Sequence, residues 1–291
     1  MLAYALATGV IFGLYFALVG VGMNLVFGVM RIVNLAHGDF IMLGAFGAFW
    51  LFRGLGLPPP VVVVLCFATL FLAGLPLYYL LVPRLFRARE PEMLSLILFF
   101  GLSQVIEAVV AMLFGNNERS IPSRLLGGGP VPIMGQTVPF AWVYAGGVSL
   151  VMLAGVYVYL YRTRLGRQTR AIMAQREEAV AIGIDIHRIS AIAFGVGSGL
   201  AAVAGVFAPF MLGSFTPSIG VSLDLTSFAV IVIGSLGNPL GTLLGGLIFG
   251  VSLMLMRTYL SSFADLLPNL VLIGVLLVKP TGLLGRRVRN A

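Results

Sequence analysis

Charged residues, cysteine, histidine and lysine are all scarce in this sequence. Only 10% of its 291 residues are charged and 59% are hydrophobic, with a mean hydropathy of +1.06. A soluble domain carries about 25% charged residues, so the composition indicates an integral membrane protein. The single cysteine, Cys66, excludes an internal disulfide, and its apolar surroundings predict a packing role.

The same scarcity argues against catalysis. The two histidines, His37 and His187, are far apart and lack the spacing of metal ligands. The one lysine, Lys279, is followed by proline, so a phosphate-binding loop has no suitable lysine. We therefore expect no enzyme, no metal site and no ATP hydrolysis by this chain itself.

Long apolar runs are abundant and predict an all-α polytopic protein with about eight transmembrane helices in one transmembrane domain, residues 1–291. A bilayer core requires roughly 20 apolar residues per helix. The expected segments fall near 2–29, 40–52, 60–82, 93–114, 140–161, 189–212, 223–256 and 266–278.

Two of these segments have the wrong length for one simple crossing. Segment 40–52 is too short, and segment 223–256 is too long and is interrupted by "GSLGNPLGT". We expect broken or re-entrant helices near 31–52 and 234–242. Irregular backbone at membrane depth is tolerated where it is buried in protein or lines a wet cavity, so both regions indicate a pathway.

The formal charge of +8 follows membrane sidedness and does not indicate nucleic-acid binding. Basic residues gather at 84–89, at 162–188 and at the C-terminal end, which the positive-inside rule places in the cytoplasm. The Gly- and Pro-rich loop 115–139 is then an outer loop that could dock an external partner. The side on which the N-terminus lies stays open.

The polar string "RIVNLAHGDF" at 31–40 separates two apolar runs. Asp39 is costly at membrane depth, so we expect it to be paired, with Arg31 as a candidate partner, or aimed at a cavity. Asp39 either caps a helix that starts at Phe40 or contacts a substrate. Asn34 and His37 either satisfy irregular backbone or line the route.

A second acid lies in the run "GLSQVIEAVV". Gln104 and Glu107 are three residues apart on one helix face, and we expect both side chains to face the bundle interior.

The stretch from 162 to 189 predicts an amphipathic cytoplasmic helix over roughly 169–182. Gly183 can end this helix in the left-handed conformation, and Asp185 can cap the next one. A short helix held between two membrane helices is suited to docking a cytoplasmic protein. A connector lying on anionic lipid headgroups is the alternative.

Four stretches together resemble the LivH-type inner-membrane permease of branched-chain amino acid ABC importers. They are "GLYFALVGVGMNLVFGVMRIVNLAHGDFIMLGAF" at 13–46, "REEAVAIGIDIHRISAIAFGVGSGLAAVAGV" at 176–206, "VIGSLGNPLGTLLGGLIFG" at 232–250 and "KPTGLLG" at 279–285. The combination is specific and runs almost end to end. The resemblance implies a multi-pass subunit of the bacterial inner membrane with a cytoplasmic C-terminus.

The resemblance also implies partners: a second, homologous permease subunit, two cytoplasmic ATPase subunits that bind ATP-Mg, and a periplasmic substrate-binding protein. The chain itself would need no cofactor. By likeness to the coupling loop of ABC importers, ATPase contacts would involve the following residues: Arg176, Glu177, Glu178, Ala179, Gly183 and Ile184.

The implied mechanism is alternating access driven by the ATPases, with this subunit supplying half of a central route. Residues expected to line or shape that route come from the two broken regions: Asn34, His37, Asp39, Ser235 and Asn238. Branched-chain amino acids are the expected substrate, and the same family also serves urea, short amides and aromatic or other organic acids. An ion-coupled carrier using Asp39 or Glu107, or a passive channel, is a remote alternative.

Overall fold

The computed structural model describes residues 1–279 and 281–285. Within them the chain forms eleven α-helices, two short 3-10 helices and one small antiparallel hairpin. The α-helices are α1 (Leu2–Met30), α2 (His37–Gly54), α3 (Pro59–Leu85), α4 (Pro91–Phe114), α5 (Phe140–Arg162), α6 (Arg164–Ala174), α7 (Arg176–Ala181), α8 (Ile186–Leu212), α9 (Ile219–Gly234), α10 (Pro239–Tyr259) and α11 (Leu267–Val278). The 3-10 helices are η1 (Ser123–Leu126) and η2 (Ser261–Leu266), and the strands are β1 (Val131–Ile133) and β2 (Gln136–Val138).

Each expected apolar segment forms a helix, which confirms an all-α polytopic membrane protein. Six helices of the described chain are long and apolar enough to cross a membrane, namely α1, α3, α4, α5, α8 and α10. The long segment 223–256 is divided into α9 and α10, as its glycines and proline predict, with residues 235–238 between them. The helix count of about eight therefore depends on how the shorter helices α2, α9 and α11 are counted.

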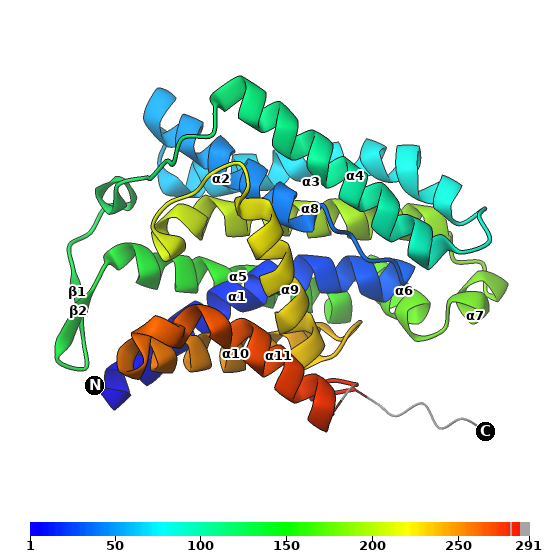
Figure 1. The fold of residues 1–291 in the computed structure, drawn as a ribbon. Helices are drawn as coiled ribbons and strands as arrows, with labels where there is room; N and C mark the ends of the chain where they lie inside the picture. Colours follow the sequence, from blue (N-terminus) through cyan, green and yellow to red (C-terminus); the bar gives the residue numbers. More distant parts are fainter. Residues whose placement is uncertain (280, 286–291) are drawn as a thin grey trace.

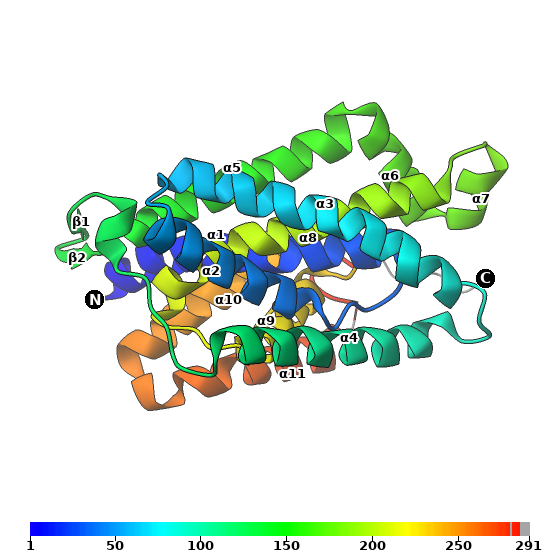
Figure 2. The ribbon, with the colours of Figure 1, turned by 90° about the horizontal axis from the view of Figure 1, so that it is seen from above.

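The helices run lengthwise in a bundle with α1 and α8 near its middle (Figures 1 and 2). The β1–β2 hairpin lies at one end of the bundle and α6 and α7 lie at the other. Helix α1 begins at the hairpin end and runs toward the α6–α7 end (Figure 1). Three of the basic C-terminal residues used to predict sidedness, at 286, 287 and 289, lie outside the described residues.

Small residues bring the backbones of α1 and α10 close together. A methyl group on Gly13 of α1 would lie 2.7 Å from the Cα atom of Leu247 in α10, and one on Gly246 would lie 2.5 Å from the backbone nitrogen of Ala17. Such contacts leave no room for a side chain. They explain why small residues four apart recur in both helices.

Helix α2 begins beside the middle of α1 and not at the end of α1. His37, its first residue, contacts the carbonyl oxygen of Val19, which lies eleven residues before the last residue of α1. At 1.5 Å per residue this is about 16 Å along the helix. Residues 31–36 therefore run back along the bundle, and α2 starts inside it. The helix has 18 residues, so the short segment 40–52 gains length at both ends.

The cytoplasmic stretch differs from the expected single helix over 169–182. Two helices, α6 and α7, meet at Gln175, whose extended backbone (φ −150°, ψ 105°) ends one helix and begins the other. Other details are confirmed: Gly183 has φ +82°, and the Asp185 side chain accepts a hydrogen bond from the backbone nitrogen of Arg188 at 3.0 Å. The sequence did not reveal the break because Gln175 is a good helix former.

The expectation that Gln104 and Glu107 both face the bundle interior is wrong for Gln104. In this single chain Gln104 is exposed and Glu107 is half-buried on α4. Helix α4 lies at one side of the bundle and makes few contacts with its neighbours, so most of its surface is open (Figure 2).

Candidate functional site

The first interruption, residues 31–36, satisfies much of its polar chemistry locally. The Oδ1 atom of Asn34 accepts a hydrogen bond from the backbone nitrogen of Ala36 at 3.1 Å, which forms a tight turn before α2. His37 Nε2 lies 3.0 Å from the Val19 carbonyl oxygen and fastens the first turn of α2 to α1. Both side chains are buried, so each one stabilises the irregular backbone around it.

Asp39 does not cap the helix that was expected to start at Phe40. Helix α2 starts at His37, and the Asp39 side chain lies in its first turn without a capping hydrogen bond. Arg31 is not its partner either, because that guanidinium reaches the carbonyl oxygen of Met173 at 3.5 Å. Asp39 is fully buried, and neither carboxylate oxygen has a hydrogen-bond partner among the described residues.

The acid that caps α2 comes from another helix. The carboxylate of Asp224, on α9, accepts a hydrogen bond from the backbone nitrogen of Gly38 at 2.7 Å. This amide is one of the orphan donors of a helix N-terminus, so the contact suits the partial positive charge there. At the same crossing a methyl group on Gly38 would overlap the carbonyl oxygen of Gly220, which explains why glycine occupies this position.

Sequence reasoning missed Asp224. The residue lies in the run "GVSLDLTSFAV", which was assigned to an apolar segment as a whole. An ionisable residue inside a membrane helix is a candidate functional group by default, and that signal was available. Its contact with α2 could not be foreseen, since 186 residues separate Gly38 from Asp224.

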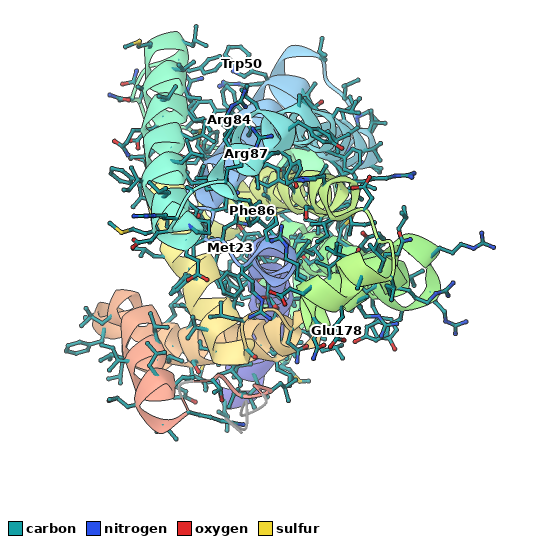
Figure 3. All side chains as sticks on the ribbon, turned by 90° about the vertical axis from the view of Figure 1, so that its right-hand side faces the viewer. Met23, Trp50, Arg84, Phe86, Arg87 and Glu178 are labelled. Atoms are coloured by element: carbon teal, nitrogen blue, oxygen red, sulfur yellow. The ribbon has the colours of Figure 1, made fainter. Side chains whose placement is uncertain are left out.

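Asp224 lines a cavity of about 390 Å³ between α1, α4, α9 and the interruption before α2. The cavity wall is apolar apart from two side chains, Ser103 and Asp224, and the described lining includes no basic residue. The apolar lining consists of Met23, Val33, Leu35, Leu96, Phe100, Val221, Leu225 and Phe228. Met23 lies near the centre of the bundle when it is viewed from the α6–α7 end (Figure 3).

The second interruption, residues 235–238, is fastened by one side chain of α1. Asn24 Nδ2 donates to the carbonyl oxygens of Ser235 (3.2 Å) and Asn238 (3.0 Å) and contacts the hydroxyl oxygen of Thr242 at 2.5 Å. Its Oδ1 atom accepts from the backbone nitrogen of Gly237 at 2.5 Å. A single buried amide thus supplies partners for the irregular backbone.

Asn238 has a further role as the N-cap of α10. Its side-chain oxygen accepts hydrogen bonds from the backbone nitrogens of Leu240 and Gly241 at 3.1 and 3.3 Å. Ser235 has φ +131°, and its side chain is buried. Neither residue lines the 390 Å³ cavity. Their role in a pathway therefore stays a prediction, and so do the equivalent roles of Asn34, His37 and Asp39.

The described part of the "KPTGLLG" motif closes the other side of this interruption. The backbone nitrogens of Leu283 and Leu284 donate to the carbonyl oxygens of Ile233 and Gly234, at 2.9 and 3.1 Å. These carbonyls are among the last of α9 and would otherwise lack partners. The two ends of the second interruption are thus held by chain segments more than 200 residues apart, Asn24 on one side and this turn on the other.

The cytoplasmic helix α7 is anchored by two residues and leaves its tip open. The Arg176 guanidinium lies over the Phe86 ring, 4.0 Å from its centroid, and Ala179 is buried. Burial lowers the pKa of Arg176 below its ordinary value. Glu177 and Glu178 are exposed, as Figure 3 shows for Glu178 at the edge of the molecule.

The turn that follows α7 returns the chain to the bundle. Gly183 is exposed in its left-handed conformation, and Ile184 packs partly against the core. The apolar side chains of Val180, near the end of α7, and of Ile182, directly after it, are 53% and 75% exposed. The stretch thus presents acidic and apolar side chains on a short, anchored element. Among the described residues no cluster of histidine, cysteine or carboxylate groups has an arrangement that could hold a metal ion.

Comparison with known proteins connects this fold to transport. Residues 5–278 match the family described as "Branched-chain amino acid transport system / permease component". The chain is 29% identical to the high-affinity branched-chain amino acid transport system permease protein BraD of Pseudomonas aeruginosa, over 97% of this chain and 95% of BraD. It is also 29% identical to the corresponding LivH protein of Escherichia coli K12, over 96% of this chain and 94% of LivH.

A shorter similarity reaches a sugar transporter. The ribose import permease protein RbsC of Haemophilus influenzae is 32% identical over 40% of this chain and 36% of RbsC. No solved structure matches the chain.

Proposed function

The chain belongs to the branched-chain amino acid transport permease family, and we propose that it is the permease subunit of an ABC importer that carries branched-chain amino acids across the bacterial inner membrane. The observation that supports this function is the family match over residues 5–278, which includes nearly every membrane helix and both interruptions. The chain acts as a transport subunit and performs no chemistry on its substrate.

The working complex contains this chain, a homologous second permease subunit, two cytoplasmic ATPase subunits and a periplasmic substrate-binding protein. ATP-Mg is bound and hydrolysed by the ATPase subunits, and this chain carries no cofactor. The C-terminus and the α6–α7 end face the cytoplasm, since the loops near 84–89 and 162–188 carry nine of the 18 basic residues. The β1–β2 hairpin and the N-terminus then face the periplasm.

The exposed tip around α7 is the docking element for an ATPase subunit. Arg176 and Ala179 hold the helix on the bundle, while Glu177 and Glu178 offer charge to the partner. Gly183 and Ile184 return the chain to α8, one of the central helices. Movement of the tip during ATPase closure is thereby passed to the helix that packs most tightly against α2 and α3. The result is alternating access of a central route.

The chemistry of the cavity favours an apolar substrate. Its described wall is hydrocarbon except for Ser103 and Asp224, a lining that suits a branched aliphatic side chain. Urea would find few hydrogen-bonding groups there, and an organic anion would meet a carboxylate. The cavity therefore favours the amino acid over those alternatives within the same family.

Reconstitution tests this function. The complete complex is placed in liposomes, and ATP hydrolysis and uptake are measured with the binding protein loaded in turn with leucine, urea or an aromatic acid. We expect stimulation by the leucine-loaded form. Stimulation by urea or the aromatic acid instead would reassign the substrate, and solute uptake without any ATPase would contradict the importer.

An Ile182→Asp variant adds a control for coupling within the same assay. Because Ile182 is 75% exposed, the substitution leaves the fold of the permease intact. It places a charge where the ATPase is expected to dock, so hydrolysis should lose its dependence on the loaded binding protein. Unchanged stimulation in this variant would remove the tip of α7 from the coupling surface.

A further inference from the structure

Two carboxylates from different helices meet where α2 crosses α9. Asp224 accepts the backbone hydrogen bond of Gly38 at 2.7 Å, and Asp39 lies one residue further along α2. The Asp39 carboxylate lies against Gly220, one turn before Asp224 on α9. Ser103 of α4 lies near Asp39 without the geometry of a hydrogen bond, and Glu107 of the same helix is a further acid nearby.

This pair has no counter-charge among the described residues. Both oxygens of Asp39 are buried without any partner, although Asp39 is completely enclosed by protein. An unpaired acid at membrane depth is expensive, and such residues usually face the bundle interior or a water-filled pathway, where they pair with another polar group. Structural capping accounts for one oxygen of Asp224 and leaves the rest of the pair unexplained.

The cavity brings this pair within reach of a ligand. Asp224 forms part of the wall of the 390 Å³ space, together with Ser103. A volume of this size is within the range of small-molecule pockets, about 300–1,000 Å³. Met23, Phe100 and Phe228 contribute to the apolar part of the same wall. The site therefore has a negative end and a hydrocarbon body.

We propose that Asp224, with Asp39 behind it, binds the ammonium group of the transported amino acid, and that the substrate's branched side chain lies against the apolar wall. This inference rests on the proposed function and identifies its recognition group. Because the described cavity lining contains no basic residue, the substrate carboxylate has no charged partner there. Recognition in this subunit should thus depend on the amino group more than on the carboxylate.

The first test separates charge from shape. Asp224→Asn keeps an oxygen that can accept from Gly38 but removes the negative charge. Leucine uptake by the reconstituted complex should fall on the order of tenfold or more, because a desolvated charge pair loses one partner. The thermal unfolding midpoint should stay near the wild-type value. Glu92→Gln is the matched control for uptake, since Glu92 is an exposed acid in the first turn of α4 and lies outside the cavity.

The second test uses wild-type complex only and remains valid if Asp224→Asn fails to assemble. Proteoliposomes are loaded internally with isoamylamine, which is leucine without its carboxylate, or with 4-methylpentanoate, which is leucine without its amino group. The amine should inhibit leucine uptake, and the acid should not.

The outcomes distinguish this inference from the proposed function. If wild-type complex imports no leucine, the proposed function fails. If it imports leucine while Asp224→Asn imports it equally well, or while 4-methylpentanoate inhibits as strongly as isoamylamine, the ammonium site is overturned and the importer stands. Asp224 would then be only a helix cap.

Discussion

The bundle is interrupted twice at membrane depth, before α2 at residues 31–36 and between α9 and α10 at residues 235–238, and the two interruptions treat their polar groups differently. At the second, Asn24 and the Asn238 cap supply hydrogen-bond partners to the backbone of the joint. At the first, Asn34 and His37 are satisfied, but Asp39 has no partner and lies beside a cavity-lining acid.

This difference suggests a structural role for the second interruption and a binding role for the first. A closed hydrogen-bond network in a low-dielectric interior is rigid and holds one geometry, because breaking any member leaves a buried group unsatisfied. An open carboxylate gains from any cation that reaches it. The second interruption thus holds α9 and α10 in one arrangement, while the first contains the unpartnered acid that we propose to lie behind the ligand site.

The largest effect on stability should come from removing Asn24, the centre of the hydrogen-bond network at the second interruption. Asn24→Ala removes partners from the carbonyl oxygens of Ser235 and Asn238 and from the amide of Gly237. The Gly237 amide is left unsatisfied, which costs about 1–3 kcal/mol, while the two carbonyl oxygens keep the backbone amides of Asn238 and Thr242 as donors and each lose one hydrogen bond worth about 1 kcal/mol. The loss of stability should therefore total several kcal/mol. We expect a large fall in the thermal unfolding midpoint of the purified permease, measured by fluorescence-detected size exclusion.

Thr8→Ala is the matched control for that experiment. Thr8 is a buried polar residue on the same helix, and its hydroxyl bonds only to carbonyl oxygens of its own turn, at 2.7 Å to Tyr4. The fall in the thermal unfolding midpoint of Thr8→Ala should be small. Equal midpoints for Asn24→Ala and Thr8→Ala would show that the second interruption does not depend on the Asn24 network.

A smaller effect should follow from separating α2 and α9 at the first interruption. A methyl group at Gly38 would overlap the Gly220 carbonyl oxygen, so Gly38→Ala forces the crossing apart. Such overpacking costs about 1–3 kcal/mol, and it also pulls Asp39 away from Asp224. We expect a fall in leucine uptake that is larger than this loss of stability alone would cause.

Gly47→Ala provides the comparison within the same helix. A methyl group there would meet only the Cys66 sulfur, at 3.5 Å, which is an ordinary contact. Alanine also has the higher helix propensity by about 1 kcal/mol, so this variant should keep full uptake. A Gly38→Ala protein with normal uptake would mean that the crossing of α2 and α9 tolerates more movement than its contacts indicate.

The lengths of the apolar runs predicted the fold well because each membrane helix leaves a local signal. All eight apolar segments form helices, and the break near 235–238 was marked by Pro239 and its neighbouring glycines. The cap at Asp185 and the left-handed Gly183 were also predictable, since both depend on a few adjacent residues. The division of the cytoplasmic helix at Gln175 was not, because glutamine is a good helix former.

The candidate site was less predictable because its contacts join distant parts of the chain. Asp39 could be identified as an unusual residue, but the assigned cap and the Arg31 partner were wrong. The residue that caps α2 is Asp224, and Asn24 on α1 holds the second interruption. Both side chains lie inside apolar runs. The sequence therefore shows that burying them is costly, but it does not show which distant residue offsets that cost.

The smallest effect on stability should come from His37, a buried residue whose side chain already has a hydrogen-bond partner. His37→Ala removes one hydrogen bond, to the Val19 carbonyl at 3.0 Å, and a Ser227 hydroxyl still reaches that oxygen at 3.3 Å. The loss of stability should be about 1 kcal/mol, so the complex assembles. Because His37 begins the turn that carries Asp39, uptake should fall through displacement of that acid. His37→Gln, whose amide can donate to the same carbonyl, should restore both readouts. Wild-type uptake by His37→Ala would show that Asp39 is positioned by α9 alone, and the first interruption would then depend on fewer contacts than the second.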